Sequence, residues 1–322
     1  WFDKPLQFVV AENGESGFIG EHGMMDGQPT SLLCDWVLGR LSSGSKEVEM
    51  DFSGAACAAA AANATLEGPT EVRLELDERL RTAVWAAKGR FDALVAREDC
   101  HVLEFDAFGK EEIKRKAKIS PDAFCQMAIQ LAYFRWSKGR RGATYEACSV
   151  RRFLHGRTET IRSCHAPGAD FVDAMASLTP SPEEDAAAYA LLKKAAAHQS
   201  WYSAQAANAM GCDRHLLGLK LLLEPGEEMP SIFSDPIHAR SAHWTLSTST
   251  VASEHIAIVG FGEVVPDGFG VGYMCHEHSF SATITSQRLG AADFSEHLEK
   301  SLLDMRDLAE RVHSPTNPRA KL

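Results

Sequence analysis

The alternation of side chains at the start of the chain predicts a β-hairpin. Leu6, Phe8 and Val10 would lie on the same face of an extended segment. Residues 12–17 are rich in Asn, Gly and Ser, which favour a tight turn, and apolar residues resume the strand after it. His22 therefore stands where the second strand of the hairpin ends.

Apolar positions at helical and strand spacing continue along the rest of the chain. The predicted helices span residues 29–41, 78–97, 120–135 and 293–312, with two more between residues 180 and 210. The predicted strands span residues 72–76, 101–105, 256–261, 270–273 and 280–285, and residues 244–250 form either a strand at a sheet edge or a cluster of hydroxyl donors. Because helices and strands alternate without a strict βαβ rhythm, the expected fold class is α/β with a mixed sheet.

A change of composition divides the chain. Residues 42–70 are rich in Ser, Gly and above all Ala, which offers no large side chain for packing. This stretch is most simply a linker or an insertion, so we expect a domain boundary near Pro69. Residues 1–69 would then end a first domain that carries His22, and residues 70–322 would form a second domain.

Composition narrows the class of protein. The chain has 322 residues, of which 45% are hydrophobic and 24% charged, and its formal net charge is −11. These values are typical of a globular protein and disfavour a general nucleic-acid binder, which carries basic stripes. There is no run of 18 apolar residues, so no transmembrane segment is predicted. Because the chain begins at Trp1, directly before a strand and without a leader peptide, we expect it to be part of a longer protein.

Three features concern cellular location and metals. The eight cysteines form no C-x-x-C pair, which favours reduced thiols over a disulfide framework. Cys275-His276-Glu277-His278 resembles a set of metal ligands, but neighbours in a strand point to opposite faces, so no metal site is predicted there. The terminal residues Ala320-Lys321-Leu322 resemble a peroxisomal address, although three residues at an exposed end can match by chance.

Two segments carry candidate chemistry. His22 is followed four residues later by Asp26, and a helical turn there would place the carboxylate beside the imidazole, as in a general base with an orienting group. The alternative is a histidine that only ends a strand. Residues 110–118 hold five basic side chains, and Ser120-Pro121-Asp122 then favours a helix start. A basic loop before a helix N-terminus suits a phosphorylated ligand, whereas the alternative is a solvated lysine-rich loop.

Several stretches together resemble the carnitine/choline acyltransferase family. They occur in family order and cover about the second half of a family member: WFDKPLQFVV, EHGMMDG, FGKEEIKRKAKISPDAF, QLAYFR, TYEACSVRRFLHGRTETIRS, DRHLLGLK, LSTST and VVPDGFGVGY. The resemblance implies two domains of chloramphenicol-acetyltransferase-like topology, each a mixed sheet with flanking helices. Between them a tunnel would admit coenzyme A (CoA) from one end and carnitine from the other.

The resemblance also implies a role for individual residues. His22 would be the general base, Asp26 would orient it, and the hydroxyl of Ser249 would stabilise the oxyanion. The CoA-binding residues would be Lys110, Lys114, Ser120 and Asp122. The carnitine-binding residues would be Tyr145, Thr158, Arg214, Ser247 and Phe261, and Val259 would line the acyl pocket. No permanently bound cofactor and no metal are implied, since CoA is a substrate.

The chain departs from the family pattern at three positions. Ala147 stands where a serine is common, Thr250 where a glutamine is common, and Gln199 where an arginine can assist CoA binding. The activity implied is the reversible transfer of an acetyl or short acyl group between CoA and the carnitine hydroxyl. The alternatives are a medium- or long-chain carnitine acyltransferase and a non-catalytic CoA-binding half. The expected partners are carnitine, acyl-CoA and the missing first half, in the peroxisome or the mitochondrion.

Overall fold

The computed structural model describes residues 4–42, 71 and 73–314. Its largest element is a mixed sheet in the strand order β3-β8-β7-β6-β4-β5. The strands are β3 (Asp99–Phe105), β8 (Phe280–Ser286), β7 (Phe269–Cys275), β6 (Leu246–Thr250), β4 (Thr144–Ser149) and β5 (Thr158–Ile161). β6 pairs in parallel with both β4 and β7, and the other neighbours pair antiparallel. The predicted α/β class with a mixed sheet is confirmed.

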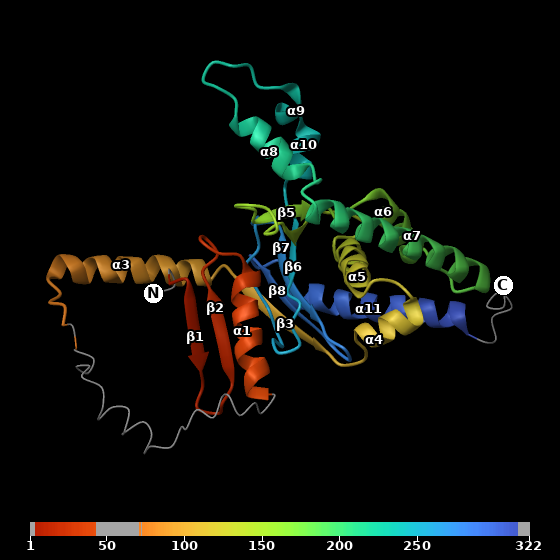
Figure 1. The fold of residues 1–322 in the computed structure, drawn as a ribbon, viewed down its shortest axis with the longest axis horizontal. Coiled ribbons are helices and arrows are strands. Elements are labelled where there is room, and N and C mark those ends of the chain that lie inside the picture. The colour runs from red at the N-terminus through yellow and green to blue at the C-terminus, as the bar shows by residue number, and fades with distance from the viewer. Residues whose placement is uncertain (1–3, 43–70, 72, 315–322) are drawn as a thin grey trace.

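Helices pack on one face of this sheet and form the core with it (Figure 1). They are α5 (Pro121–Trp136), α6 (Ala166–Ala176), α7 (Pro182–Ala207) and α11 (Ala291–His313). The fully buried core residues include Phe124, Leu131, Leu192, Leu246, Phe269, Val271, Phe294 and Leu302. Three short helices project beyond the sheet near β5, namely α8 (Asp213–Leu221), α9 (Ser231–Ser234) and α10 (Pro236–Ser241).

The predicted hairpin is confirmed, and it lies beside the large sheet on the side away from α5 and α11 (Figure 1). Strands β1 (Leu6–Val10) and β2 (Ser16–Gly20) pair antiparallel with Phe8 opposite Phe18. Gly14 adopts a φ of +87° in the connecting turn, which explains why a glycine is needed there. Helix α1 (Gly27–Ser42) follows the hairpin, and α3 (Glu78–Val95) begins after the undescribed segment.

The start of α5 agrees with the sequence, but the basic segment before it does not. Ser120 caps the helix by accepting a hydrogen bond from the backbone N–H of Ala123 at 3.4 Å, and Pro121 takes the first helical position. The predicted basic loop is wrong, because residues 110–117 form α4 (Lys110–Glu112) and the π-helix η2 (Ile113–Ala117). Lys118, with a φ of +53°, then ends η2.

Four further expectations from the sequence are corrected. Residues 182–207 form one helix rather than two, since no Gly or Pro interrupts them. Of the two alternatives for residues 244–250, the edge strand is wrong, because β6 lies inside the sheet. Residues 73–76 form no strand. Residues 256–261 also form no strand, because carbonyls of this segment accept from side chains of β8 instead of a ladder. The boundary predicted near Pro69 and the terminal residues 320–322 lie outside the described residues.

Candidate active site

The face of the sheet opposite the helices carries polar residues from adjacent strands. In β6, Ser247 and Ser249 project to the same face because side chains alternate along a strand. Tyr145 of β4 stands directly opposite Ser247 in the parallel register. Thr248 projects to the other face, where its hydroxyl accepts a hydrogen bond at 3.0 Å from Gln126 of α5. The two predicted serines and the predicted tyrosine therefore share one surface.

Three of the predicted carnitine-binding residues meet beside this surface. The Tyr145 hydroxyl donates to the Thr158 hydroxyl oxygen at 3.4 Å. Arg214, at the start of α8, donates from Nε to the Thr158 carbonyl at 2.8 Å and from Nη2 to its hydroxyl at 3.3 Å. The Arg214 backbone N–H also donates to Glu159 at 3.3 Å. A guanidinium, a phenol and a hydroxyl thus converge, which suits recognition of a carboxylate.

His22 lies in the turn between β2 and α1, and its side chain is 68% exposed. Since α1 begins only at Gly27, the helical turn proposed for the spacing of His22 and Asp26 is wrong. The two side chains are still neighbours, with 4.0 Å between His22 Nδ1 and Asp26 Oδ1. An accessible imidazole beside a carboxylate is competent to accept a proton from a bound substrate.

Arg157, just before β5, holds the turn that carries His22. Its Nε and Nη2 donate to Asp26 Oδ1 at 3.0 and 2.8 Å. Its Nη1 donates to the Gly23 carbonyl and its Nη2 to the His22 carbonyl, each at 3.0 Å. The Nη2 atom also lies 3.4 Å from His22 Nδ1. Asp26 thus acts on the histidine through a shared arginine as well as through its own proximity.

The segment that contains Val259 and Phe261 lies against the same face of the sheet. A Cβ atom added to Gly272 would lie 2.5 Å from the Val259 carbonyl oxygen, and one added to Gly270 would lie 2.9 Å from Gly262. Because Gly272 pairs with Ser249, the segment runs beside the serine strand. The predicted acyl-pocket and aromatic residues therefore lie near the predicted oxyanion donor.

The predicted CoA-binding residues lie at the far end of β7 and along the approach to α5. Lys110 forms ion pairs with Glu254 and, at 3.4 Å, with Glu277. Among the described residues, Lys114 forms no ion pair. Ser120 serves as the cap of α5, so its hydroxyl is already engaged with the backbone. The four residues therefore differ: Lys114 is exposed, Lys110 is half-buried among acids, and Ser120 and Asp122 already have partners near the start of α5.

Asp122 belongs to a buried polar network between the sheet and the helices. Its carboxylate accepts a hydrogen bond at 2.6 Å from the hydroxyl of Tyr273. Glu146 of β4 accepts from Ser163 at 3.0 Å and from Gln199 at 2.6 Å. Burial, and then the nearby Asp122 carboxylate, raise the pKa of Glu146 well above its usual range. Burial also raises the pKa of Asp122, so the two acids favour a state in which a proton is retained.

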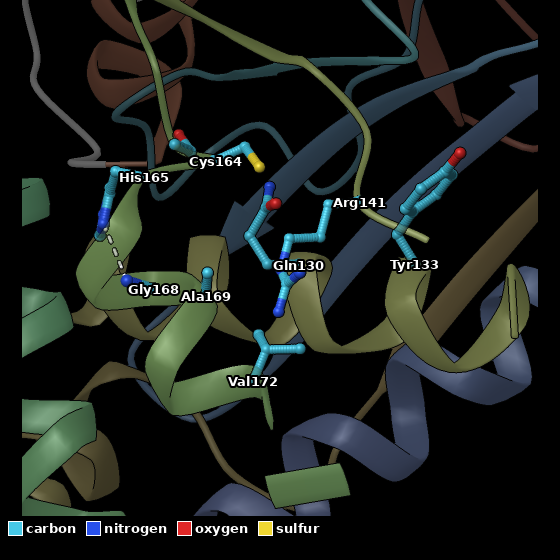
Figure 2. Close-up of a pocket in the computed structure, with 9 residues that line it drawn as sticks. Gln130, Tyr133, Arg141, Cys164, His165, Gly168, Ala169 and Val172 are labelled. Atoms are coloured by element: carbon cyan, nitrogen blue, oxygen red, sulfur yellow. Dashed lines mark hydrogen bonds between the residues drawn. The ribbon is translucent and has the colours of Figure 1, made fainter. Parts of the chain in front are cut away.

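A small pocket on the helix side contains none of the predicted site residues. It lies between α5 and α6 and is lined by residues that include Gln130, Arg141, Cys164 and His165, as Figure 2 shows. His165 uses Nδ1 to accept from the Gly168 backbone N–H at 3.0 Å, and burial lowers its pKa to about 4. This histidine is therefore a helix cap, and the pocket is distinct from the site on the opposite face of the sheet.

No group of three or more His, Cys, Asp or Glu side chains among the described residues is arranged to hold a metal ion. In the same part of the chain, every helix is too short or too polar to cross a membrane.

Comparison with known proteins identifies the family to which this geometry belongs. The family model described as choline/carnitine O-acyltransferase matches residues 1–302. The chain belongs to the choline/carnitine O-acyltransferase family. Carnitine O-acetyltransferase of Homo sapiens is 38% identical over 329 residues, which cover 100% of this chain and 49% of that protein. This member of the family thus spans about half the length of the curated relatives it matches.

Other relatives differ in acyl acceptor or acyl donor. Choline O-acetyltransferase of Danio rerio is 35% identical, covering 99% of this chain and 49% of that protein. Mitochondrial carnitine O-palmitoyltransferase 2 of Bos taurus is 33% identical, covering 96% of this chain and 46% of that protein. The family resemblance drawn from the sequence motifs is therefore confirmed, whereas the choice among these substrates depends on particular residues.

Arg157 at the site and Glu146 in the buried network behind it were not found from the sequence. Arg157 lies in a segment that the sequence describes only as polar and arginine-rich, and the sequence offers no signal that it meets Asp26, 131 residues earlier. Glu146 follows the predicted Tyr145, and its place in a strand could have suggested that it points into the core. An acidic residue at a buried strand position was the available signal.

Proposed function

We propose that the protein of which this chain is part is a carnitine O-acetyltransferase, with His22 as the general base. The observation that carries this proposal is the meeting of Tyr145, Thr158 and Arg214 beside the serine strand. This group suits the carboxylate of carnitine, and choline has no carboxylate to occupy it. Because Arg157 and Thr158 are consecutive, the same short stretch contacts both the His22 turn and Arg214.

The proposed reaction needs no covalent enzyme intermediate. His22 takes the proton of the carnitine hydroxyl as its oxygen attacks the acyl carbonyl of acyl-CoA. The Ser249 hydroxyl donates to the tetrahedral oxyanion. Collapse of this intermediate breaks the carbon–sulfur bond, and the protonated His22 returns the proton to the CoA sulfur. In the reverse direction His22 takes the proton of the CoA thiol. A positioned base contributes typically about 10²–10⁴-fold to the rate.

The two ligands would bind on opposite sides of His22. Arg214, Thr158 and Tyr145 would hold the carnitine carboxylate, and Ser247 lies next to Tyr145 in the sheet. The ring of Phe261 would face the trimethylammonium group, where a cation–π contact is favourable. Lys110 and Lys114 would face the 3′-phosphate of CoA. The roles of Ser120 and Asp122 would be to shape that segment, because both side chains have partners within the protein.

Val259 supports a preference for short acyl groups. Its carbonyl packs against Gly272, opposite Ser249, so a branched side chain at this position would limit the space for a long chain. The second candidate is a longer-chain carnitine acyltransferase, which the similarity to the palmitoyltransferase supports. Initial rates with acetyl-, octanoyl- and palmitoyl-CoA distinguish the two, and a preference for palmitoyl-CoA would defeat our proposal.

The central test is His22→Ala in the full-length protein. We expect this variant to lose carnitine-dependent release of CoA from acetyl-CoA while it still binds CoA. His215→Ala is a matched control, because His215 belongs to α8 and has no role in the proposed reaction. If His22→Ala retained full activity, the mechanism would be wrong. If the unchanged protein bound CoA without any transfer, the non-catalytic alternative would replace it.

For location, we propose the peroxisome on the basis of Ala320-Lys321-Leu322. A mitochondrial location is the alternative, since relatives named as mitochondrial are found in yeast and cattle. Removal of the last three residues from a fluorescent fusion of the full-length protein tests the proposal. An unchanged distribution would reject the peroxisomal address.

A further inference from the structure

Two carboxylates occupy the position on Lys110 where an anion would bind. The ammonium forms a close ion pair with Glu254, and the Glu277 carboxylate lies 3.4 Å away. Lys110 is only 25% exposed, whereas Glu254 and Glu277 are 56% and 47% exposed. The hydrogen bond that Lys110 donates to Glu254 lowers the pKa of this glutamate, so the acid is ionised at neutral pH. The lysine charge is therefore largely neutralised within the protein.

Backbone hydrogen bonds to the turn between β7 and β8 fix the position of Lys110. The Lys110 N–H donates to the His276 carbonyl at 2.8 Å, and the Glu111 N–H donates to the Glu277 carbonyl at 3.1 Å. Gly109 packs so closely on the turn between β7 and β8 that an added Cβ atom would lie 2.4 Å from the His276 carbonyl oxygen. Lys110 and Glu277 thus extend from one tightly joined piece of backbone, and their proximity does not depend on a mobile loop.

Glu254 approaches the same lysine from the segment after β6. Its second carboxylate oxygen lies 3.7 Å from His276 Nδ1, so the glutamate is held by a second group of the β7–β8 turn. The next lysine of the basic segment differs, since Lys114 has no ion pair among the described residues. The two predicted phosphate ligands are therefore unequal: one is already paired with two acids, and the other is available.

We propose that Glu254 and Glu277 are specificity-determining residues that compete with the 3′-phosphate of CoA for Lys110. The protein consequently discriminates only weakly between CoA and 3′-dephospho-CoA. This inference rests on the proposed function, in which Lys110 and Lys114 face that phosphate. A phosphate that reaches Lys110 must displace Glu254 and approach Glu277, so it exchanges one ion pair for another and adds repulsion between like charges.

The test is calorimetric titration of the full-length protein with CoA and with 3′-dephospho-CoA at low salt. For Glu254→Gln, we expect the Kd for CoA to fall by about two- to fivefold, which is the range for one partly exposed ion pair. The Kd for 3′-dephospho-CoA should stay constant, because that ligand lacks the competing phosphate. Glu277→Gln should act in the same direction, and the double variant should show the largest ratio between the two ligands.

Glu111→Gln is the matched control. It removes one negative charge beside Lys110, but its carboxylate lies 3.2 Å from His278 Nδ1 and forms no ion pair with the lysine among the described residues. An equal gain of CoA affinity in Glu111→Gln and Glu254→Gln would reveal a general charge effect and overturn the proposal. An unchanged ratio in Glu254→Gln would also overturn it. The calorimetric titration contains no carnitine, so it does not depend on acetyl transfer. Absence of acetyl transfer would therefore reject the proposed function, but the comparison of CoA with 3′-dephospho-CoA could still be interpreted.

Discussion

Arg157 Nη2 lies 2.8 Å from Asp26 Oδ1 and also donates to the His22 carbonyl at 3.0 Å. One guanidinium therefore fixes both the carboxylate and the backbone of the turn that presents the imidazole. The bonds of Arg157 need a planar fork of donors, which lysine cannot supply. Since Thr158 comes next in the chain and accepts from Arg214, the base and the carboxylate clamp have a common support.

Arg157→Ala is expected to lower kcat by about 10- to 100-fold, because a base that leaves its position by about 1 Å can lose that much rate. KM for acetyl-CoA should change little, since Arg157 lies away from the lysines. Steady-state kinetics of the full-length protein provide the measurement. Arg157→Lys should recover only part of kcat, as it restores the charge without the fork.

A nearby arginine provides the control for this prediction. Arg152 donates to the Asn208 side chain at 2.8 Å and does not contact the His22 turn. Arg152→Ala should therefore leave kcat within about twofold of the original, as expected for a surface substitution. If both alanine variants lost activity equally, Arg157 would have a structural role only.

A double-mutant cycle with Asp26→Ala and Arg157→Ala is expected to be non-additive. Either single change breaks the same Asp26–Arg157 pair, so the second change should cost little more than the first. Coupling energies for contacting residues are about 0.5–3 kcal/mol. The cycle is measured on kcat, and strictly additive effects would mean that the pair does not act as one unit.

Arg214→Asn is expected to raise KM for carnitine by about 10- to 100-fold, since hydrogen bonds to a charged group contribute about 1.5–3 kcal/mol. KM for acetyl-CoA should stay nearly constant. Choline as acceptor supplies an internal control. Because choline has no carboxylate, the rate of transfer to choline should not fall in this variant. A matching loss for carnitine and choline would instead point to a distorted site.

The contribution of Glu146 to the stability of the protein is expected to fall as the pH rises above the ordinary glutamate pKa of about 4.3. Glu146 has a raised pKa in the folded state, so it stays protonated after the unfolded chain has ionised. Its contribution to the free energy of unfolding is complete below the unfolded pKa and is lost as the pH rises through the folded pKa. The melting temperature of Glu146→Gln minus that of the unchanged protein should therefore be larger at about pH 8 than at about pH 5.

Differential scanning fluorimetry at both pH values measures this change. Glu299→Gln is the control, since Glu299 lies exposed on α11 and should leave the pH dependence as it was. A Glu146→Gln variant with the same slope against pH as the unchanged protein would show that this acid is not the group responsible.

Local signals in the sequence were sufficient for the elements that surround the site. The Asn-Gly turn predicted the hairpin, and Ser120-Pro121 predicted the start of α5. Both features could be predicted because turns and helix caps depend on residues that are neighbours in the chain. The π-helix before α5 was missed, since its single wide turn has no distinctive spacing of apolar residues. The irregular segment at residues 256–261 was also missed, because its carbonyls find partners on β8.

The site itself could be predicted only in part. Motif resemblance named Tyr145, Thr158 and Arg214, and the structure brings these three together. The support that Arg157 gives to the His22 turn was not predictable, because it depends on how the fold places β5 against a turn 131 residues earlier. The same holds for Lys110, whose acidic partners come from two separate segments. Sequence shows which residues carry charge, but the fold decides which charges meet.

The segment over Gly270 and Gly272 has a consequence for how substrate range can change. Its position depends on glycines beneath it and on hydroxyls that hold its carbonyls, as in the 2.8 Å bond from Thr285 to Phe261. These contacts involve the backbone of the segment and not the side chain of Val259. If residue 259 lines the acyl pocket, as we propose, we expect its exchange to disturb the fold less than exchange of Gly270 or Gly272, so acyl selectivity could change at a small cost in stability.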